Sequence, residues 1–479
     1  MDIPQGYKQT ELGIIPEDWE IVNLGSVAKI NGRIGFRGYT TADLVGVGQG
    51  AYTIGGKHIT NMVLDLHDAE YISWQKYYES PEIMVRKGDI VFAQRGTLGK
   101  SAFIVNDIGP ATINPSLVLI NKIKCDNEYL SYWLQCDKIV EYICSINSQT
   151  SIPMITQNQI EHIPVVLSRI KAEQQAIAEA LGDIDGLIAT LDKKIAKKRL
   201  IKQGAMSQLL TGKKRLPGFS DPWVEKKLGE IGYTYSGLTG KSKDDFGQGN
   251  AKYITFLNVL ANPILKENLF GSITIRENEQ QNKVQFGDLF FNTSSETPED
   301  VGTCAVLLSY HEELYLNSFC FGYRLTDDNV LGLYLAYYFR SRLGRQLMTS
   351  LAQGATRYNL SKELFNASRI ILPETKDEQI AIATMLNDMD KEIDDLEAQR
   401  DKYRLLKSGM MQKLLTGQIR LTKPLTNVVP LVPGDSAVRE IPVDAHIWAG
   451  HIVNRLWQSK GWGRTKLQLS LIHISEPTR

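Results

Sequence analysis

The sequence predicts an α+β protein built as a tandem repeat. We expect two mixed α/β domains, each followed by a long helix, with the two helices paired as an intramolecular antiparallel coiled coil. One observation is a gapless duplication, because Glu173–Leu216 recurs at Glu378–Leu421 and half of the 44 paired positions are identical. A heptad pattern of apolar residues in both copies is another. A repeat of this length indicates two copies of one structural unit, related by pseudo-twofold symmetry.

The duplication divides the chain into six regions. The expected boundaries are 1–170 for the first α/β domain, 171–215 for the first helical spacer, 216–376 for the second domain and 377–421 for the second helical spacer. A linker rich in Pro and Val follows at 422–435, and then an additional segment at 436–479, which we expect to be the truncated start of a further domain. Its last ten residues, 470–479, resemble translated sequencing-adapter sequence, so we expect a non-native C-terminus that resequencing of the locus would test.

Apolar residues in both long segments alternate spacings of four and three, which predicts a coiled-coil seam. No proline interrupts either run. The predicted seam residues are Ile177, Leu181, Ile184, Ile188, Leu191 and Ile195 in the first copy, and Ile382, Leu386, Met389, Ile393 and Leu396 in the second.

Beyond these residues the seam positions become polar or amphipathic, and such residues can set the register and orientation of a helix pair. They are Lys198, Lys202, Arg400, Tyr403 and Lys407. Each helix is expected to end at a Thr-Gly pair, where Gly212 or Gly417 provides a left-handed cap. A helix of this size is about 57 Å long.

Pairing of the two helices with each other is favoured by their matched seams. Antiparallel pairing would place the two α/β domains at opposite ends of a rod. The alternative is that each helix packs on its own domain or on another protomer.

Short matching segments also precede each helix. Val85–Asp89 corresponds to Val284–Asp288, and Tyr129–Trp133 corresponds to Tyr334–Tyr338. Between these segments the two copies differ in loop length and polar content. The pattern indicates a shared framework that carries two different sets of loops.

The polar loops carry side chains suited to DNA. Arg and Lys suit guanine edges and phosphates, and Asn and Gln suit adenine edges. The candidate DNA-binding residues are Arg33, Arg37, Lys57, His58, Gln94, Arg95 and Lys100 in the first domain, and Lys241, Lys243, Asn292, Thr293, Ser294, Arg357 and Tyr358 in the second. Any single residue of this set could be an ordinary solvated surface residue, so the prediction is collective.

Composition limits the class of protein. The chain has 54 basic and 54 acidic residues, so its formal net charge of zero argues against indiscriminate nucleic-acid binding. No apolar stretch approaches the roughly 20 residues that cross a bilayer, and no signal peptide is evident, so we expect a cytoplasmic protein without membrane association. The five cysteines form no CxxC pair, which predicts buried free thiols.

Motifs for catalysis are lacking. The Gly-Lys-Ser strings at 99–101 and 240–242 lack the earlier glycine of a P-loop, which is Gln94 in one and Tyr235 in the other. Asn114-Pro115-Ser116 does not match the Asp/Asn-Pro-Pro-aromatic site of a DNA methyltransferase. The histidines have no Ser or Cys partner in any recognised motif. We therefore expect no catalytic, cofactor-binding or metal-binding residues in this chain.

The opening Gly6–Glu20 (GYKQTELGIIPEDWE), the two Glu-Gln-x-Ala-Ile-Ala helix starts and the two Leu-Leu-Thr-Gly ends followed by Arg-Leu resemble the specificity (S) subunits of type I restriction-modification systems. The resemblance covers about 420 of the 479 residues. It implies that each domain is a target recognition domain for one half of a split, asymmetric double-stranded DNA site. Two domains held apart by such a rod could reach half-sites whose centres lie about one turn of the DNA helix apart, roughly 34–36 Å.

The resemblance also implies partners in a host defence system. The helices would dock two methyltransferase (M) subunits, which carry S-adenosylmethionine and methylate adenine N6. Restriction (R) subunits, which use ATP and Mg, would join them, and this chain itself would be the non-catalytic recognition subunit. Gly354–Tyr358 (GATRY) resembles the family's junction between domain and helix, whereas its counterpart Gln149–Pro153 lacks the Gly-Ala pair and the Arg.

Two other classes of protein remain open at this stage. One is a duplicated coiled-coil scaffold that binds only proteins, and the other is a stand-alone DNA-modifying enzyme. Partner binding without DNA sequence preference would identify the scaffold, and S-adenosylmethionine turnover by the isolated chain would identify the enzyme.

Overall fold

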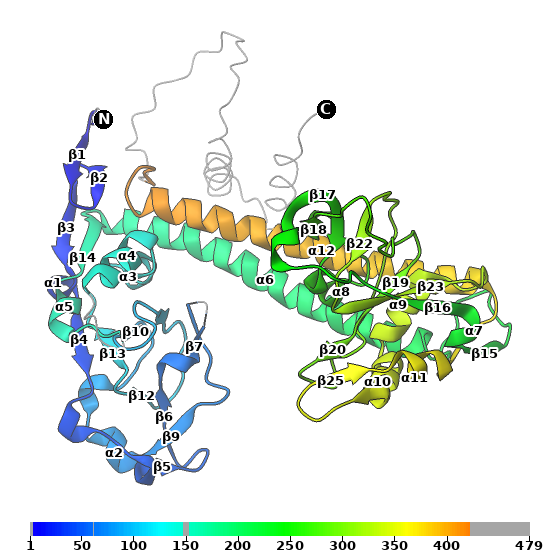
Figure 1. The fold of residues 1–479 in the computed structure, drawn as a ribbon. Coiled ribbons are helices and arrows are strands. Elements are labelled where there is room, and N and C mark those ends of the chain that lie inside the picture. Colours follow the sequence, from blue (N-terminus) through cyan, green and yellow to red (C-terminus); the bar gives the residue numbers. More distant parts are fainter. Residues whose placement is uncertain (1–2, 61, 147–152, 422–479) are drawn as a thin grey trace. The chain divides into compact units, whose positions relative to one another are not determined.

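The computed structural model of the chain describes residues 3–60, 62–146 and 153–421 (Figure 1). The predicted linker at 422–435 and the segment at 436–479 lie outside the described residues. The described chain divides into two compact units: unit 1 contains the described residues up to Ala189 and those from Arg400 to Leu421, and unit 2 contains Thr190–Gln399. Each unit therefore holds one α/β domain and a part of both long helices.

Unit 1 is built around two sheets. The central sheet has strand order β11-β10-β13-β4 and is antiparallel, and the second sheet, β12-β6-β9-β5, contains one parallel pair, β12 with β6. Their strands are β4 (Lys29–Gly32), β5 (Leu44–Val45), β6 (Gly50–Ile54), β9 (Glu70–Ser73), β10 (Ile90–Ala93), β11 (Ser101–Phe103), β12 (Ala111–Ile113) and β13 (Leu117–Asn121). Three strand pairs lie outside these sheets: β1 (Tyr7–Thr10) with β2 (Gly13–Pro16), β3 (Trp19–Asn23) with β14 (Pro164–Ser168), and β7 (Ile59–Thr60) with β8 (Val63–Leu64).

Unit 2 repeats this topology. Its central sheet has the order β21-β19-β23-β16, and β22-β17-β18 again contains one parallel pair, β17 with β22. These strands are β16 (Gly232–Ser236), β17 (Phe246–Ile254), β18 (Phe270–Ile273), β19 (Leu289–Asn292), β21 (Cys304–Val306), β22 (Leu314–Leu316) and β23 (Cys320–Leu325). Further strands are β15 (Trp223–Lys227) with β26 (Arg369–Pro373), and a small sheet of β20 (Ser294–Ser295), β25 (Tyr358–Leu360) and β24 (Ala352–Gln353). The shared strand order confirms the predicted tandem repeat.

The central strands are apolar on both faces because they separate two cores. In β13, Val118 and Ile120 pack in the core that contains the helices, and Leu117 and Leu119 pack in the core under the second sheet. Successive residues of a strand point to opposite faces, so a strand buried on both sides needs a continuous apolar run. The sequence Leu117–Ile120 supplies that run.

The matched turn before β10 and β19 has one geometry in both units. Gly88 and Gly287 have φ of +90° and +87°, a region that favours glycine. The side chain of Asp89 accepts a hydrogen bond from the N–H of Arg86 at 2.8 Å, and that of Asp288 does the same from Gln285 at 2.8 Å. The Gly-Asp pair found in both repeats therefore makes the same turn.

Each unit also contains a set of short helices. In unit 1 they are α1 (Leu24–Val27), α2 (Trp74–Tyr78), α3 (Asn127–Leu134), α4 (Asp137–Ile146) and α5 (Gln157–Glu161). In unit 2 they are α7 (Leu228–Ile231), α8 (Phe256–Ala261), α9 (Gly332–Arg340), α10 (Arg342–Leu351) and α11 (Lys362–Ala367). The aromatic segments that match between the repeats form α3 and α9, whose side chains are largely buried.

The two predicted long helices are α6 (Lys171–Leu209) and α12 (Lys376–Leu414). In unit 2, Lys198 pairs with Glu392 and Lys202 with Asp390, so the partner's number falls as the number on α6 rises. This order confirms antiparallel pairing within one chain.

The seam residues fall into two groups. Ile195, Ile393 and Leu396 form a small core with Leu191 between the two helices. Ile177 and Leu181 instead join the core of the unit 1 domain, together with Met411 and Leu414 of α12, and Ile382, Leu386 and Met389 pack in the unit 2 core with Leu209 of α6. Ile184 is buried and Ile188 is half-buried. The seam therefore packs on the domains as well as on the opposite helix.

Both helices end as predicted. Gly212 and Gly417 have φ of +67° and +70°. The N–H of Lys214 donates to the carbonyl of Gln208 at 3.2 Å, as expected for a glycine-capped helix end.

The cysteine prediction is correct for four of the five residues. Cys125, Cys136, Cys304 and Cys320 are buried free thiols, whereas Cys144 is exposed. Cys144 follows the buried Ile143 on α4, and one step along a helix turns a side chain by about 100° away from the core.

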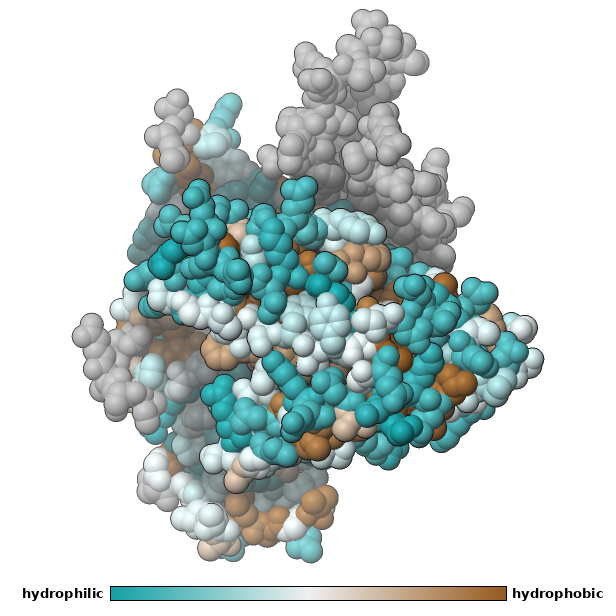
Figure 2. Space-filling view, turned by 45° about the vertical axis from the view of Figure 1, so that its right-hand side comes forward, coloured by the Kyte–Doolittle hydropathy of each residue, from teal (hydrophilic) through white to brown (hydrophobic). Residues whose placement is uncertain are grey.

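One face of the molecule is largely polar. In the view of Figure 2, hydrophilic side chains dominate, and hydrophobic residues form small separate patches. Within the described ranges, no helix is long and apolar enough to span a membrane.

Candidate nucleic-acid interface

In unit 2, four of the predicted residues are brought together at the end of β19. Ser294 and Ser295 of β20 pair with Asn359 and Tyr358 of β25. The exposed Arg357 donates from Nε to Oγ of Ser294 at 3.3 Å. Thr293, which precedes Ser294, accepts at its carbonyl from the N–H of Leu360 at 2.8 Å. Thr293, Ser294, Arg357 and Tyr358 therefore form one polar surface, which we call the unit 2 loop site.

Asn292 belongs to the support of this site rather than to its surface. It is buried, and its Nδ2 donates to the carbonyls of Ser294 at 3.3 Å and Asp300 at 3.1 Å. Its Oδ1 accepts from the N–H of Thr303 at 2.6 Å. This position corrects the expectation that the Asn292 side chain is free in a loop, because it holds the loop from inside.

The two predicted lysines of unit 2 lie at the start of β17. The Lys241 side chain is 3% exposed; it pairs with Glu279 and donates to the carbonyl of Thr274 at 2.7 Å. This ion pair lowers the pKa of Glu279. Lys241 is thus not a free surface cation, contrary to expectation, whereas Lys243 is exposed.

Unit 1 has an equivalent loop between β10 and β11. The N–H groups of Gln94 and Arg95 donate to the carbonyl of Ser116 at 3.0 and 3.3 Å, and Arg95 forms an isolated bridge with Met154. Nε2 of Gln94 donates to the carbonyl of Pro115 at 3.0 Å. Arg95 is exposed, and Lys100 lies half-exposed at the other end of the loop. We call Gln94, Arg95 and Lys100 the unit 1 loop site.

Arg33 lies inside unit 1. Its side chain donates to the carbonyl of Ile113 at 3.1 Å and to Oγ1 of Thr112 at 2.9 Å, and its guanidinium lies 5.2 Å from the centre of the Tyr39 ring. Burial lowers the pKa of Arg33. The expectation that Arg33 projects from a surface loop is therefore wrong, since a carbonyl and a hydroxyl of β12 hold its guanidinium.

Arg37 and Lys57 have carboxylate partners. Arg37 lies 3.5 Å from Glu82, and Lys57 lies 3.3 Å from Asp68. His58 is 2% exposed, and its Nδ1 accepts from a backbone N–H, so it too is corrected to an internal residue. Burial lowers the pKa of His58, which favours its neutral form.

Two clusters at the base of the domains were not identified from the sequence. In unit 1, the hydroxyl of Tyr132 donates to Asp185 at 2.8 Å, Lys407 lies 2.8 Å from Asp185, and Nζ of Lys407 lies 5.2 Å from the centre of the Tyr132 ring. A short domain helix, α6 and α12 each supply one member of this set, which we call the unit 1 lock.

The unit 2 lock consists of Tyr337, Asp390 and Lys202. The Tyr337 hydroxyl donates to Asp390 at 2.8 Å, Lys202 pairs with Asp390, and Nζ of Lys202 lies 5.3 Å from the Tyr337 ring centre. Tyr337 and Asp390 lie 205 residues after Tyr132 and Asp185, whereas Lys202 lies 205 residues before Lys407. The helices therefore exchange roles: α6 gives the lysine and α12 the aspartate. The polar seam positions Lys202 and Lys407 were the available sequence signal.

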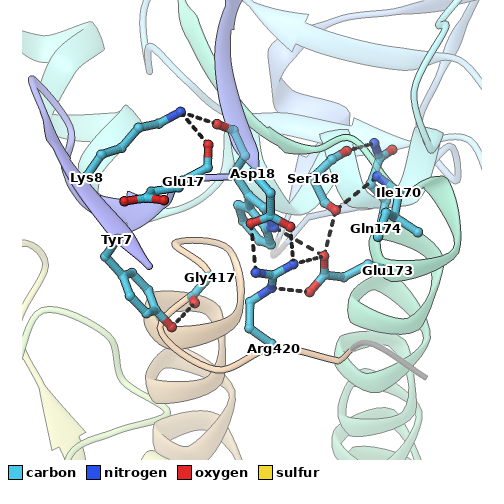
Figure 3. Close-up of polar contacts among 11 residues, drawn as sticks. Tyr7, Lys8, Glu17, Asp18, Ser168, Ile170, Glu173, Gln174, Gly417 and Arg420 are labelled. Carbon is cyan, nitrogen blue, oxygen red and sulfur yellow. Dashed lines mark hydrogen bonds and ion pairs between the residues drawn. The ribbon is translucent and has the colours of Figure 1, made fainter. Parts of the chain in front are cut away.

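Besides the lock, unit 1 has a group of ion pairs centred on Arg420, which follows α12 (Figure 3). We call this group the unit 1 junction. The guanidinium of Arg420 donates to Asp18 at 2.9 and 2.8 Å and to Glu173 at 2.6 and 3.0 Å. The indole Nε1 of Trp19 donates to the same buried Glu173 at 3.2 Å. The hydrogen bond from Arg420 lowers the pKa of Asp18.

Unit 2 has a related junction at Arg215. This residue donates to Glu378 at 2.5 and 2.6 Å, and its guanidinium lies 5.9 Å from the Trp223 ring centre. The arginine that follows each Thr-Gly helix end thus binds the glutamate near the start of the other long helix: Arg215 after α6 binds Glu378 of α12, and Arg420 after α12 binds Glu173 of α6.

The lock and junction contacts are hydrogen bonds, ion pairs and cation–π contacts within each unit. Among the described residues, no group of three or more His, Cys, Asp or Glu side chains could hold a metal ion.

Two domains of one topology, each with an exposed loop site at the same place and a locked helical base, define a duplicated two-site architecture. The chain belongs to the family of the type I restriction modification DNA specificity domain, which matches at residues 16–198 and again at 220–403.

Individual proteins support the same assignment. The chain is 24% identical over 432 residues to the type I restriction enzyme MjaVIII specificity subunit of Methanocaldococcus jannaschii, covering 87% of this chain and 96% of that protein. The crystal structure of a type I restriction-modification S subunit from M. genitalium is similar with a TM-score of 0.52 at 14% identity, covering 86% and 98% of the two chains. A chain from a structural study of type I R-M complex assembly and conformational transition gives a TM-score of 0.53 at 15% identity, covering 85% and 99%. These structures support the fold.

Proposed function

We propose that this chain is the DNA sequence-specificity subunit of a type I restriction-modification complex. Each unit would bind one half of a split, asymmetric site in double-stranded DNA through its loop site. The chain would be the non-catalytic recognition subunit of an N6-adenine methyltransferase and endonuclease complex.

The observation that carries this proposal is the equivalence of the two loop sites. The unit 1 site follows β10 and the unit 2 site follows β19, which hold the same place in the central sheet of their unit. Each site also pairs with a segment that follows the domain helices: Arg95 bridges Met154, and β20 pairs with β25. The unit 1 site presents Arg95, and Gln94 supports it, because Nε2 of Gln94 donates to the carbonyls of Pro115 and Leu117. The unit 2 site presents Thr293, Ser294 and Arg357. Arginine pairs with guanine edges and phosphates, and Ser or Thr can bond to more than one kind of base edge. One framework with two sets of base-reading groups favours an asymmetric site.

Partners would supply the chemistry. Two methyltransferase subunits would dock on the long helices and carry S-adenosylmethionine, and restriction subunits would use ATP and Mg in the cytoplasm. The zero net charge of this chain fits such a complex, because the partners can provide phosphate contacts.

The test is methylome sequencing of a host that expresses this chain with its neighbouring methyltransferase subunit. The same host without this chain is the control. We expect a new N6-methyladenine motif, split and asymmetric, that depends on this chain. Binding to the methyltransferase without any new motif would instead support a duplicated protein scaffold, and turnover of S-adenosylmethionine by the isolated chain would show an enzyme.

A further inference from the structure

An exposed phenylalanine lies against the unit 2 loop site. Phe319 is 59% exposed, and its carbonyl accepts a hydrogen bond from the N–H of Thr293 at 2.9 Å. Its ring makes an edge-to-face contact with the ring of Phe256, with centroids 6.4 Å apart. The Phe319 ring is therefore largely exposed to solvent, on a residue whose backbone is joined to the unit 2 loop site.

The turn that presents this ring is fixed from inside. Asn317 is 5% exposed; its Oδ1 accepts from the N–H of Phe319 at 2.9 Å and its Nδ2 donates to the carbonyl of Ile254 at 3.0 Å. An exposed aromatic ring on a backbone held in this way loses little conformational freedom on binding a partner. The site is thus preorganised.

Unit 1 contains the same turn with a different side chain. Oδ1 of Asn114 accepts from the N–H of Ser116 at 2.9 Å and from its hydroxyl at 2.6 Å. The carbonyl of Ser116 accepts from the N–H of Gln94 at 3.0 Å, as that of Phe319 does from Thr293. Both repeats therefore place one residue at the same point of the loop site, a serine in one and a phenylalanine in the other.

The chemistry of DNA restricts what an apolar ring can recognise at this position. Base edges in the major groove present hydrogen-bonding groups, except for the 5-methyl group of thymine, which is apolar and favours contact with side chains such as Phe. A phenylalanine cannot donate to or accept from a base edge, whereas a serine can do both.

We propose that Phe319 is a specificity-determining residue that contacts the 5-methyl group of a thymine in the half-site bound by unit 2. This inference rests on the proposed function. It also implies that Ser116, at the equivalent position in unit 1, contacts a polar base edge or a phosphate.

The test measures DNA binding by the complete complex of this chain with its methyltransferase subunits. The DNA is a duplex carrying the site found by methylome sequencing, in which each thymine of both half-sites is replaced in turn by deoxyuridine, which lacks the methyl group. One replacement should weaken binding about fourfold, which corresponds to the burial of one methyl group. In the Phe319→Ala complex that replacement should have no effect, and in Phe319→Leu, which keeps an apolar side chain, a partial effect should remain.

A matched control is Phe286→Ala, because Phe286 is 47% exposed in the same unit but stacks on Tyr310. This control should keep the full deoxyuridine effect. The inference is overturned if the effect of every thymine replacement is unchanged in Phe319→Ala. It is also overturned if Phe319→Ala prevents assembly with the methyltransferase, since the ring would then be a protein contact. If the unmodified complex binds all sequences equally, the proposed function itself fails, which is a different result.

Discussion

Nζ of Lys407 lies 2.8 Å from Oδ1 of Asp185, so the last turns of the second long helix are tied to the first long helix inside unit 1. The carboxylate also accepts a hydrogen bond from Tyr132 of the domain. Lysine, aspartate and tyrosine thereby join three elements at one point. Lys202 and Asp390 repeat the arrangement in unit 2.

Lys407→Met should lower the free energy of unfolding of unit 1 by about 1 kcal/mol. The cost stays moderate because Asp185 is partly exposed and keeps water and Tyr132 as partners. Thermal or denaturant unfolding measures it, and Lys402→Met, at an exposed position of α12, is the control. Equal losses in both variants would show that the ion pair contributes nothing.

Arg420→Ala should be more destabilising, by about 3 kcal/mol, because it leaves the fully buried carboxylate of Glu173 without its cation. Although Arg420 lies at the end of the second repeat, the damage should appear in the first domain. Hydrogen exchange should therefore accelerate in β3 and β14, which hold Trp19 and Ser168 beside Glu173, and remain unchanged in β15. Accelerated exchange confined to β15 would contradict this assignment.

The ion pair of Asp18 with Arg420 should make stability depend on pH. The folded-state pKa of Asp18 lies below its ordinary value of 3.8, because Arg420 donates hydrogen bonds to the carboxylate. A lowered pKa stabilises the folded state above pH 3.8, and this contribution is lost as the pH falls through the folded-state value. The difference in unfolding free energy between the unmodified chain and Asp18→Asn should hence be constant near neutral pH and shrink below about pH 4. A difference that grows on acidification would reverse the sign and refute the interpretation.

Ile195→Ala should cost about 2–5 kcal/mol, since this side chain is buried between the long helices against Ile393 and Leu396. Leu200→Ala, on the same helix but 68% exposed, is the matched control and should be nearly neutral. Denaturant unfolding of both variants gives the comparison. A near-neutral Ile195→Ala would argue against a packed seam at this point.

Arg357→Ala should weaken or relax recognition of one half-site, by about 1–3 kcal/mol for a lost base contact, and leave the other half-site intact. Arg95→Ala should affect the opposite half. Methylome sequencing of each variant shows which bases of the motif become degenerate. Arg342→Ala replaces an exposed arginine elsewhere in unit 2 and should leave the motif unchanged. Loss of both halves in either single variant would contradict the assignment of one half-site to each unit.

The two long helices were predictable because helix signals are local. Heptad spacing, the absence of proline and the Thr-Gly ends identified α6 and α12, and their seams indicated the pairing. The polar seam positions Lys202 and Lys407 form ion pairs between the two helices. Their tyrosine partners could not be named, because Tyr132 and Tyr337 come from the domains.

The candidate site was only partly predictable. Residue type selected Arg95 and Arg357, which the structure places on exposed loops, but it also selected Arg33, Asn292 and Lys241. Arg33 donates to the carbonyl of Ile113, Asn292 donates to the carbonyl of Asp300, and Lys241 pairs with the carboxylate of Glu279. The residue type alone does not show whether a polar side chain forms hydrogen bonds inside the domain or faces solvent.

The sequence by itself determined the duplication, the family and the two helices, because these depend on repeated residues and on periodicities of a few residues. Tertiary structure alone decided which cations are free and which carboxylate each of the others meets. The physical reason is that hydrogen bonds and ion pairs form between residues far apart in the chain, as between Arg420 and Asp18, and burial raises the cost of leaving any of them unpaired. Only folding brings such partners together.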